Sequence, residues 1–289
     1  MAVTDRVGLA WRGERAGDIL RHLDAIDALE VIAEDWLYAP RRRLDALAEL
    51  ARARPLTLHG VSLGAASAAP VDAKRLDRLA RLVGHVQPAG WSEHLAFVRA
   101  GGVEIGHLAA PPRTAATVDG AVANLRRATQ AVGSPPAVEN VATLIDPPCS
   151  TLAEPVWLGT IVRGAGVPLL LDLHNLWANA QNFGHDAHGL LHALPLDHVH
   201  EVHLAGGRWW GDRVRGATRA RLLDDHLHDV PPEVYALLEA LAAAVPQPLT
   251  VIVEREGRHP PIEAMLQQLD QARQALVRGR TAARWREAA

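Results

Sequence analysis

Eight short β-like runs alternate with helical stretches along most of this chain, and this alternation constrains the fold more than any other feature. The first run is Val7–Arg12 and the last is Leu249–Glu256. Because a helical segment separates each run from the next, we expect right-handed crossovers and parallel strands. Eight such units within 289 residues favour closure of the sheet. The sequence therefore predicts an α/β fold, a single (β/α)8 TIM-like barrel domain over residues 1–289, with a C-terminal tail from about 279 to 289.

An open, doubly wound sheet is the competing architecture, and its usual sequence signature is missing. Such sheets often carry a glycine-rich phosphate loop after the first strand. Here that position reads Ala10-Trp-Arg-Gly-Glu14, and neither a GxGxxG nor a P-loop motif occurs in the chain. The longest irregular stretches, Val98–Arg113 and Gly207–Asp229, both follow strands. We therefore expect them on the face where barrel enzymes carry their active sites.

Composition narrows the choice of partners. The formal net charge of −3 gives no reason to expect nucleic acid or an anionic membrane surface. The single cysteine, Cys149, excludes an internal disulfide and a thiolate metal cluster. No apolar run is long enough to span a membrane, and residues 1–6 lack the apolar stretch of a signal peptide. We therefore expect a soluble cytoplasmic protein with no nucleic-acid or membrane partner.

Histidine and carboxylate side chains collect at the carboxyl ends of the predicted strands. Those singled out are Glu34, His59, Glu93, His94, Glu139, Asn140, Asp172, His174, Asn175, Glu201, His203, Glu254 and Glu256, with Asp224, His226 and His228 in the loop after the seventh run. Alternate residues of a strand share a face, so Asp172 is expected to point with His174, and Glu201 with His203.

Burying this many ionisable groups at a barrel mouth is costly unless a cation pairs them. Without sulfur ligands, the candidate metals are iron, manganese and zinc. Seven or more ligands exceed what one ion needs, which indicates two or three ions. Other roles stay open for some residues. Glu34, Glu93 and Glu201 suit salt bridges equally well, and Trp209 and Trp210 suit either substrate contact or packing against a helix.

The order of these motifs resembles one family, the multinuclear non-heme iron-dependent oxidative enzymes. This family was long an uncharacterised bacterial domain and includes the catalytic subunit of methanobactin biosynthesis. The resemblance runs from about Val7 to Ile262. It rests on His59-Gly-Val-Ser-Leu63, Ser92-Glu-His-Leu95, Glu139-Asn140, Leu171-Asp-Leu-His-Asn175, His203-Leu-Ala-Gly206, Asp224-Asp-His226, Val230-Pro-Pro-Glu-Val-Tyr235 and Glu254-Arg255.

The resemblance implies two or three irons and the use of dioxygen as co-substrate. The implied reaction modifies a ribosomally made precursor peptide, commonly at cysteine, often with a separate partner protein that binds the leader of that peptide. The implied metal ligands are His59, His94, Glu139, Asp172, His203, Asp224, His226 and Glu254. Glu139 and Asp172 are the candidate bridging, catalytic carboxylates. Many relatives carry Asn at the position of His174, so we add His174 as a candidate catalytic residue and ligand of a further ion.

Two other functions use the same residues. The first is a redox-neutral metal-dependent barrel, an isomerase or a phosphoester hydrolase, loaded with zinc or manganese. The second is a peptide-binding module in which the metal site is not catalytic. Metal content and oxygen consumption separate these functions. The chain also reads Glu139-Asn-Val141 where relatives often read Glu-Asn-Pro, which leaves the identity of the substrate open.

Overall fold

Eight parallel strands form a closed barrel, as the alternation predicts. The computed structural model describes residues 4–287 except 101, 212, 215–216 and 219. The strands are hydrogen-bonded in the order β1-β14-β9-β8-β7-β4-β3-β2. Their bounds are β1 Arg6–Ala10, β2 Leu29–Ile32, β3 Leu56–Gly60, β4 Gly90–His94, β7 Ala137–Glu139, β8 Leu169–Asp172, β9 Val199–Leu204 and β14 Thr250–Val253.

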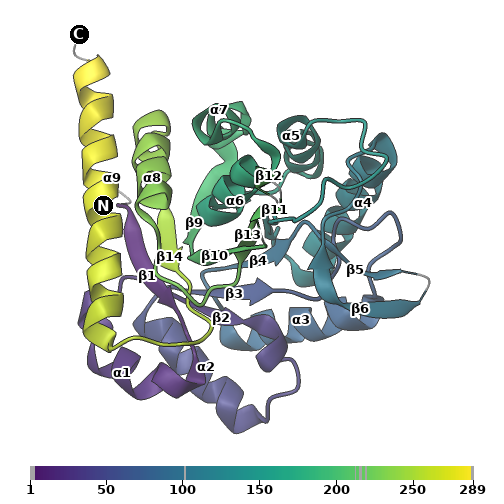
Figure 1. Cartoon of the computed structure of the whole chain (residues 1–289). Helices are drawn as coiled ribbons and strands as arrows, with labels where there is room; N and C mark the ends of the chain where they lie inside the picture. The colour runs from purple at the N-terminus through teal and green to yellow at the C-terminus, as the bar shows by residue number, and fades with distance from the viewer. Residues whose placement is uncertain (1–3, 101, 212, 215–216, 219, 288–289) are drawn as a thin grey trace. The chain divides into compact units, whose positions relative to one another are not determined.

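Helices follow most of these strands (Figure 1). They are α1 Ala16–Arg21, α2 Arg41–Ala53, α3 Ala73–Val86, α4 Ala115–Val132, α5 Glu154–Ala165, α6 Leu173–Phe183, α7 Ala187–Ala193, α8 Pro232–Ala244 and α9 Ile262–Glu287. Local chemistry sets several helix starts. Asp72 accepts hydrogen bonds from the backbone N–H groups of Lys74 and Arg75 at the start of α3, and Thr114 forms a capping box with Thr117 at the start of α4.

The chain comprises two compact units, each with its own part of the barrel wall. The terminal unit contains Met1–Ile26, Ala142–Asp146 and Leu171–Ala289, and the central unit contains Asp27–Val141 and Pro147–Leu170. In the terminal unit, β14 pairs with both β1 and β9, and helices α8 and α9 lie side by side (Figure 1). In the central unit, β2, β3, β4 and β7 pair in that order. That the chain forms one domain stays a prediction.

The structure differs from the sequence-based expectation at two helices. Helix α6 begins at Leu173, where the sequence analysis placed Asp172 and His174 on one face of a continuing strand. The cause is local, because Asp172 accepts a 2.7 Å hydrogen bond from the backbone N–H of Asn175 and so caps the helix. Helix α9 continues to Glu287 instead of giving way to a tail near 279. Arg280, within that segment, pairs with Asp5 at 2.7 Å.

The two irregular stretches contain β-hairpins. Strand β5 (Phe97–Ala100) pairs with β6 (Val103–Ala109) in the central unit. In the terminal unit, β10 (Gly207–Trp210) pairs with β13 (Arg221–Asp224), and β11 (Arg213–Val214) pairs with β12 (Ala217–Thr218). Among the described residues, none of the helices combines the length and the apolar composition that crossing a membrane requires.

Candidate metal centre

Three buried side chains meet at the carboxyl ends of β3, β4 and β7 in the central unit. We call His59, His94 and Glu139 the β3–β4–β7 cluster. The strand register brings them together, since His94 lies opposite Glu139 and His59 lies opposite Ser92, two residues before His94. The Nε2 atoms of both histidines lie 3.3 Å from the same carboxylate oxygen, Oε2 of Glu139. Sequence reasoning predicted all three residues as ligands.

The second nitrogen of each imidazole is held by a neighbouring group. Nδ1 of His94 lies 3.1 Å from the carbonyl oxygen of Gly60, and Nδ1 of His59 lies 2.7 Å from Oγ of Ser92. A carbonyl oxygen only accepts, so Nδ1 of His94 carries the proton and Nε2 presents a lone pair to the cluster. Metal-binding histidines are oriented by such contacts to the other ring nitrogen. The surroundings therefore prepare the Nε2 atoms to bind a cation.

The spacing of the donor atoms fits a metal ion better than a direct ion pair. A charge-assisted N–H···O contact is about 2.7–2.9 Å long, shorter than the distances between the imidazoles and Glu139. Two donors bound to one ion at about 2.1 Å each lie about 3.0–3.4 Å apart for octahedral to tetrahedral angles. The observed distances of 3.3 Å fall in that range. The residues present therefore fit a bound metal ion.

Replacing Ser92 by Ala is expected to weaken metal binding by the β3–β4–β7 cluster about 10–100-fold, because the imidazole of His59 loses the group that orients it. Ser92 is fully buried, and its hydroxyl has the imidazole of His59 as its partner. The measurement is competition for metal against a chelator of known affinity. Ser150→Ala is a matched control, because Ser150 bonds only to loop backbone. An unchanged affinity in the Ser92 variant would show that the hydroxyl does not orient the ligand.

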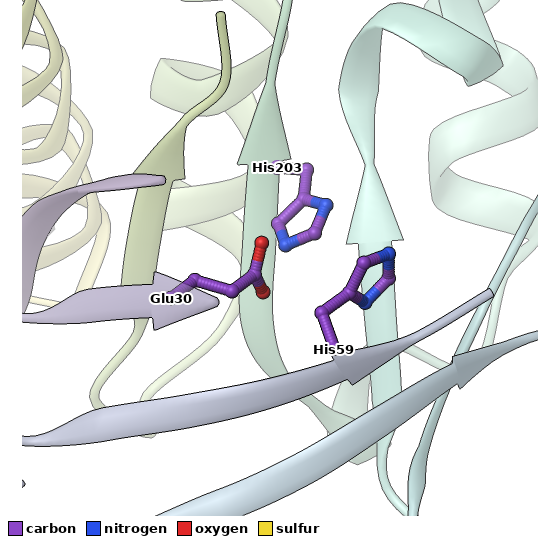
Figure 2. Close-up of side chains that lie close together, drawn as sticks. All are labelled: Glu30, His59 and His203. Atoms are coloured by element: carbon purple, nitrogen blue, oxygen red, sulfur yellow. The ribbon is translucent and has the colours of Figure 1, made fainter. Parts of the chain in front are cut away.

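A buried carboxylate that sequence reasoning missed lies next to this cluster. Glu30 of β2 is fully buried, and one of its oxygens lies within 4.8 Å of a ring nitrogen of His59. Figure 2 shows its side chain projecting from β2 on the same side as His59 of β3. The available signal was a charged residue within the otherwise apolar run Leu29-Glu-Val-Ile32, on the face that β2 shares with His59. The prediction covered carboxylates at the strand ends, and Glu30 lies two residues before the end of β2.

The terminal unit holds a second group of ligand-type side chains. Asp172 at the end of β8, His226 after β13 and Glu254 after β14 each offer a donor atom within 4.8 Å of the others. We call these three residues with His203 of β9 the β8–β9–β14 cluster. Nδ1 of His203 lies 3.1 Å from Oε2 of Glu254, and Nδ1 of His226 lies 3.7 Å from the same oxygen. All four residues are predicted ligands.

Asp224 joins the β8–β9–β14 cluster to a buried histidine. One carboxylate oxygen of Asp224 lies 2.9 Å from Nε2 of His226, and the other lies 2.8 Å from Nδ1 of His174. His174 has no exposed surface and lies outside the ligand groups found among the described residues. Because α6 begins at Leu173, His174 sits on the first helical turn, and the strand parity that paired it with Asp172 does not apply. The contact places its imidazole against the Asp224 carboxylate, and its role as a ligand or catalytic residue stays a prediction.

The hairpin that carries Asp224 is fastened to α6. The side-chain amide of Asn182 accepts a hydrogen bond from the backbone N–H of Leu222 and donates one to the carbonyl of the same residue. Gly207, opposite Asp224 in the hairpin, leaves room for His174, since a Cβ there would lie 2.6 Å from Cε1 of the imidazole. The strand register and the helix together therefore fix the position of the Asp224 carboxylate.

The electrostatic field of the β8–β9–β14 cluster favours a cation. Burial raises the pKa of Asp224, but the charge of His226 and the hydrogen bond from His174 outweigh this effect and hold the pKa well below its usual value. Burial lowers the pKa of His226, and the charges of Asp224 and Glu254 raise it well above normal. The lowered pKa of Asp224 reports the positive charge of His226 beside it, whereas the raised pKa of His226 reports the negative potential of Asp224 and Glu254. A bound metal ion satisfies that potential as a proton does.

Two carboxylates whose role the sequence left open accept hydrogen bonds from the backbone. Glu34 accepts hydrogen bonds from the N–H of Val61, and Glu93 accepts them from the N–H groups of Leu63 and His94. Together they hold the loop after β3. Burial, and next the charge of Glu34, raise the pKa of Glu93 well above its usual value. Neither residue belongs to a ligand group among the described residues, so they position the loop beside His59 and His94.

The remaining candidates are distributed around the clusters. Asn140, Asn175 and Glu201 are buried. Glu256 lies 3.7 Å from His226, and His228 lies 2.9 Å from Asp225. Trp209 and Trp210 of β10 are 52% and 59% exposed, so they do not pack into the core.

Comparison with known proteins assigns the family. The family described as "RiPP precursor modification enzyme MbnB/TglH/ChrH", where RiPP denotes a ribosomally made and modified peptide, matches residues 6–277. The chain belongs to this family. The match spans both clusters, and it confirms the resemblance that the ordered motifs suggested.

Two relatives match nearly all of this chain and are described only as UPF0276 proteins. A "UPF0276 protein" from Rhizorhabdus wittichii is 33% identical over 270 residues, which cover 92% of this chain and 93% of the relative. Another from Streptomyces avermitilis is 36% identical over 285 residues, which cover 96% of this chain and 56% of that longer relative. These similarities support the family assignment and leave the substrate unassigned.

Solved structures share the barrel. An L-ribulose 3-epimerase has a TM-score of 0.60 at 13% identity, covering 99% of this chain and 97% of that chain. A D-psicose 3-epimerase from Clostridium cellulolyticum has a TM-score of 0.59 at 12% identity, covering 96% of this chain and 99% of that chain. At such low identity the likeness shows the fold alone.

Proposed function

We propose that this protein is an iron-dependent oxidative enzyme that modifies a ribosomally made precursor peptide, with dioxygen as co-substrate and a peptide cysteine as the modified residue. The observation that carries the proposal is the convergence of two buried imidazoles on one carboxylate oxygen, each at 3.3 Å, within a family whose members modify such peptides. A buried arrangement of this kind is costly without a cation.

The donor set supports iron. The clusters offer only imidazole and carboxylate groups, and the single cysteine, Cys149, is exposed and outside them. Such ligands suit iron, zinc and manganese, and iron is the metal of this set that most often carries oxidative chemistry with dioxygen. When bound, iron supplies one-electron redox chemistry that no side chain of the protein provides.

Each cluster has a defined role in this proposal. His59, His94 and Glu139 hold one ion, and Ser92 with the Gly60 carbonyl orients the two imidazoles. Asp172, His203, His226 and Glu254 hold a second ion, with Asp224 as a further ligand that His174 keeps in place. Two ions follow from two donor groups. A third ion would require further donors, such as Glu30.

Exposed surface on the hairpin that carries Asp224 suits a peptide. Trp209 and Trp210 lie on β10, whose partner strand β13 ends in Asp224. Adjacent large apolar side chains that are exposed to solvent often mark an interaction site. In the proposed reaction the tryptophans hold the peptide beside the metal. A separate protein that binds the leader of the peptide is part of the proposal.

Oxygen consumption tests the proposed function. Iron-loaded protein is mixed with a candidate precursor peptide encoded beside its gene, and both dissolved oxygen and peptide mass are followed. We expect oxygen uptake and a mass change that depend on the peptide and vanish when its cysteines are replaced by serine. Zinc- and manganese-loaded protein serve as controls. Equal turnover of the peptide with zinc or manganese and no oxygen uptake would replace this proposal by a redox-neutral barrel enzyme.

A further inference from the structure

A pocket with a cationic lining opens in the central unit, away from the metal ligands. Its volume is about 450 Å³, within the range of small-ligand sites. Residues from the loop after β2, from α2 and from α3 form its wall. Besides three leucines, the lining consists of Trp36, Tyr38, Arg41, Arg78, Arg81 and His85.

The three arginines of the lining concentrate positive charge that no carboxylate of the lining balances. No acidic residue lines the pocket, and no ion pair joins Arg41, Arg78 or Arg81 to a carboxylate in the part of the chain that the structure describes. Other arginines of this unit are paired, as Arg75 is with Glu104 at 2.7 Å. An anion is therefore the complementary ligand, since guanidinium groups bind carboxylates and phosphates through paired hydrogen bonds.

The start of α2 adds to this charge at a cost in helix stability. Helix α2 begins Arg41-Arg42-Arg43 and has no acidic residue in its first turn. The N-terminal end of a helix carries a partial positive charge, which disfavours cations there. Local helix stability would favour acidic residues at these positions. A bound anion compensates for the arginines that occupy them.

An aromatic ring holds one guanidinium group of the pocket in place, and a second ring stacks with an arginine that lies outside the lining. The guanidinium of Arg78 lies 4.8 Å from the centre of the Tyr38 ring, and that of Arg43 lies 4.8 Å from the centre of the Trp36 ring. Nε2 of His85 lies 2.8 Å from Asp45. Because stacking reduces the freedom of Arg78, less ordering of this side chain is required when a ligand binds.

The apolar part of the lining distinguishes between kinds of anion. Leu37, Leu44 and Leu82 line the same pocket, so it offers apolar surface beside the guanidinium groups. A small phosphate would leave this surface uncovered, whereas a peptide that combines acidic and apolar side chains covers both. Leu37 also lines a separate small cavity whose wall includes Glu34 and Glu93.

We propose that this pocket binds an acidic segment of the precursor peptide, with carboxylates on Arg41, Arg78 and Arg81 and an apolar side chain on the leucines. The proposal rests on the proposed function, because it takes the peptide as the substrate. It adds a recognition site separate from the residue that is modified. Arginines that line a binding surface set the specificity for a partner and its association rate through complementary charge.

Fluorescence anisotropy tests the proposal with the full-length, iron-loaded protein. The probes are a labelled peptide of alternating Glu and Leu and a matched peptide of Gln and Leu. We expect the wild type to bind the acidic peptide at least about tenfold more tightly than its amide counterpart. The double variant Arg78→Ala/Arg81→Ala should lose at least about tenfold in affinity for the acidic peptide. Arg52→Ala on α2, which pairs with Glu49 outside the pocket, should bind like the wild type.

Each other outcome overturns the proposal. Equal affinity for the two peptides would show that the protein does not recognise the charge of the peptide. Unchanged affinity in the double variant would show that the peptide does not bind in this pocket. Displacement of the peptide by inorganic pyrophosphate at equal concentration would assign the site to a small phosphate ligand instead. Iron content and oxygen uptake are measured on the same samples. Failure of the proposed function appears as missing iron or oxygen uptake in the wild type, whereas failure of this inference leaves both intact.

Discussion

Glu139→Gln is expected to remove the ion from the β3–β4–β7 cluster and to lower peptide turnover by at least about 1,000-fold. Oε2 of Glu139 is the atom that both imidazoles face, and the carboxylate is 2% exposed, so water cannot take its place. The amide is almost isosteric but carries no charge. Metal analysis, turnover and thermal unfolding of the variant measure the effect.

Glu104→Gln provides the matched control for this substitution. Glu104 lies in the same unit on β6, is exposed, and pairs with Arg75 and Arg99. We expect it to retain full metal content and turnover, because exposed ion pairs contribute little. A Glu139→Gln protein that kept wild-type metal content and turnover would contradict the assignment of this carboxylate as a ligand.

Gly207→Ala is expected to lower the free energy of unfolding by roughly 2–3 kcal/mol and to abolish metal binding at Asp224. A Cβ at this position would collide with the carbonyl oxygen of Leu223 and lie 2.8 Å from Nε2 of His174. The hairpin must therefore open, and Asp224 lies directly opposite Gly207 in its register. Chemical denaturation of the metal-free protein measures stability, and metal titration measures the site.

Two further variants identify the cause of the expected loss of stability in Gly207→Ala. Gly13→Ala should leave the free energy of unfolding within about 0.5 kcal/mol, because no atom would lie within 4 Å of the new Cβ. The double variant His174→Ala/Gly207→Ala should remain destabilised, since the collision with the backbone of Leu223 persists. Full recovery in the double variant would show that His174 alone limits the space.

The barrel, and most of the strands that carry the candidate metal ligands, could be predicted because each follows from a pattern of neighbouring residues in the sequence. Apolar runs of strand length alternate with helical periodicity, and parallel strands necessarily bring their carboxyl ends together. His59, His94 and Glu139 follow from that rule, and the register confirms their proximity. The hairpins at 97–109 and 207–224 were not predicted, although their pairing is local in sequence. Strands β6 and β10 are mostly exposed and therefore lack the buried face that marks a core strand.

The sixth strand shows where pattern reasoning failed. Leu171-Asp-Leu-His-Asn175 alternates apolar and polar residues and therefore suggests an extended strand with Asp172 and His174 on one face. One hydrogen bond from the backbone N–H of Asn175 to Asp172 starts a helix instead. His174 then turns to Asp224, 50 residues further along the chain, and no periodicity within the strand predicts that contact.

The most direct test of the central claim is the metal content of the protein purified without oxygen. Elemental analysis gives the identity and number of ions per chain, and Mössbauer spectroscopy of an iron-57 sample gives their oxidation states. Two donor clusters predict at least two irons per chain, with one or more ferrous and reoxidised by dioxygen. Zinc or manganese alone, unaltered by loading with iron, or a protein that binds no metal, would contradict the account.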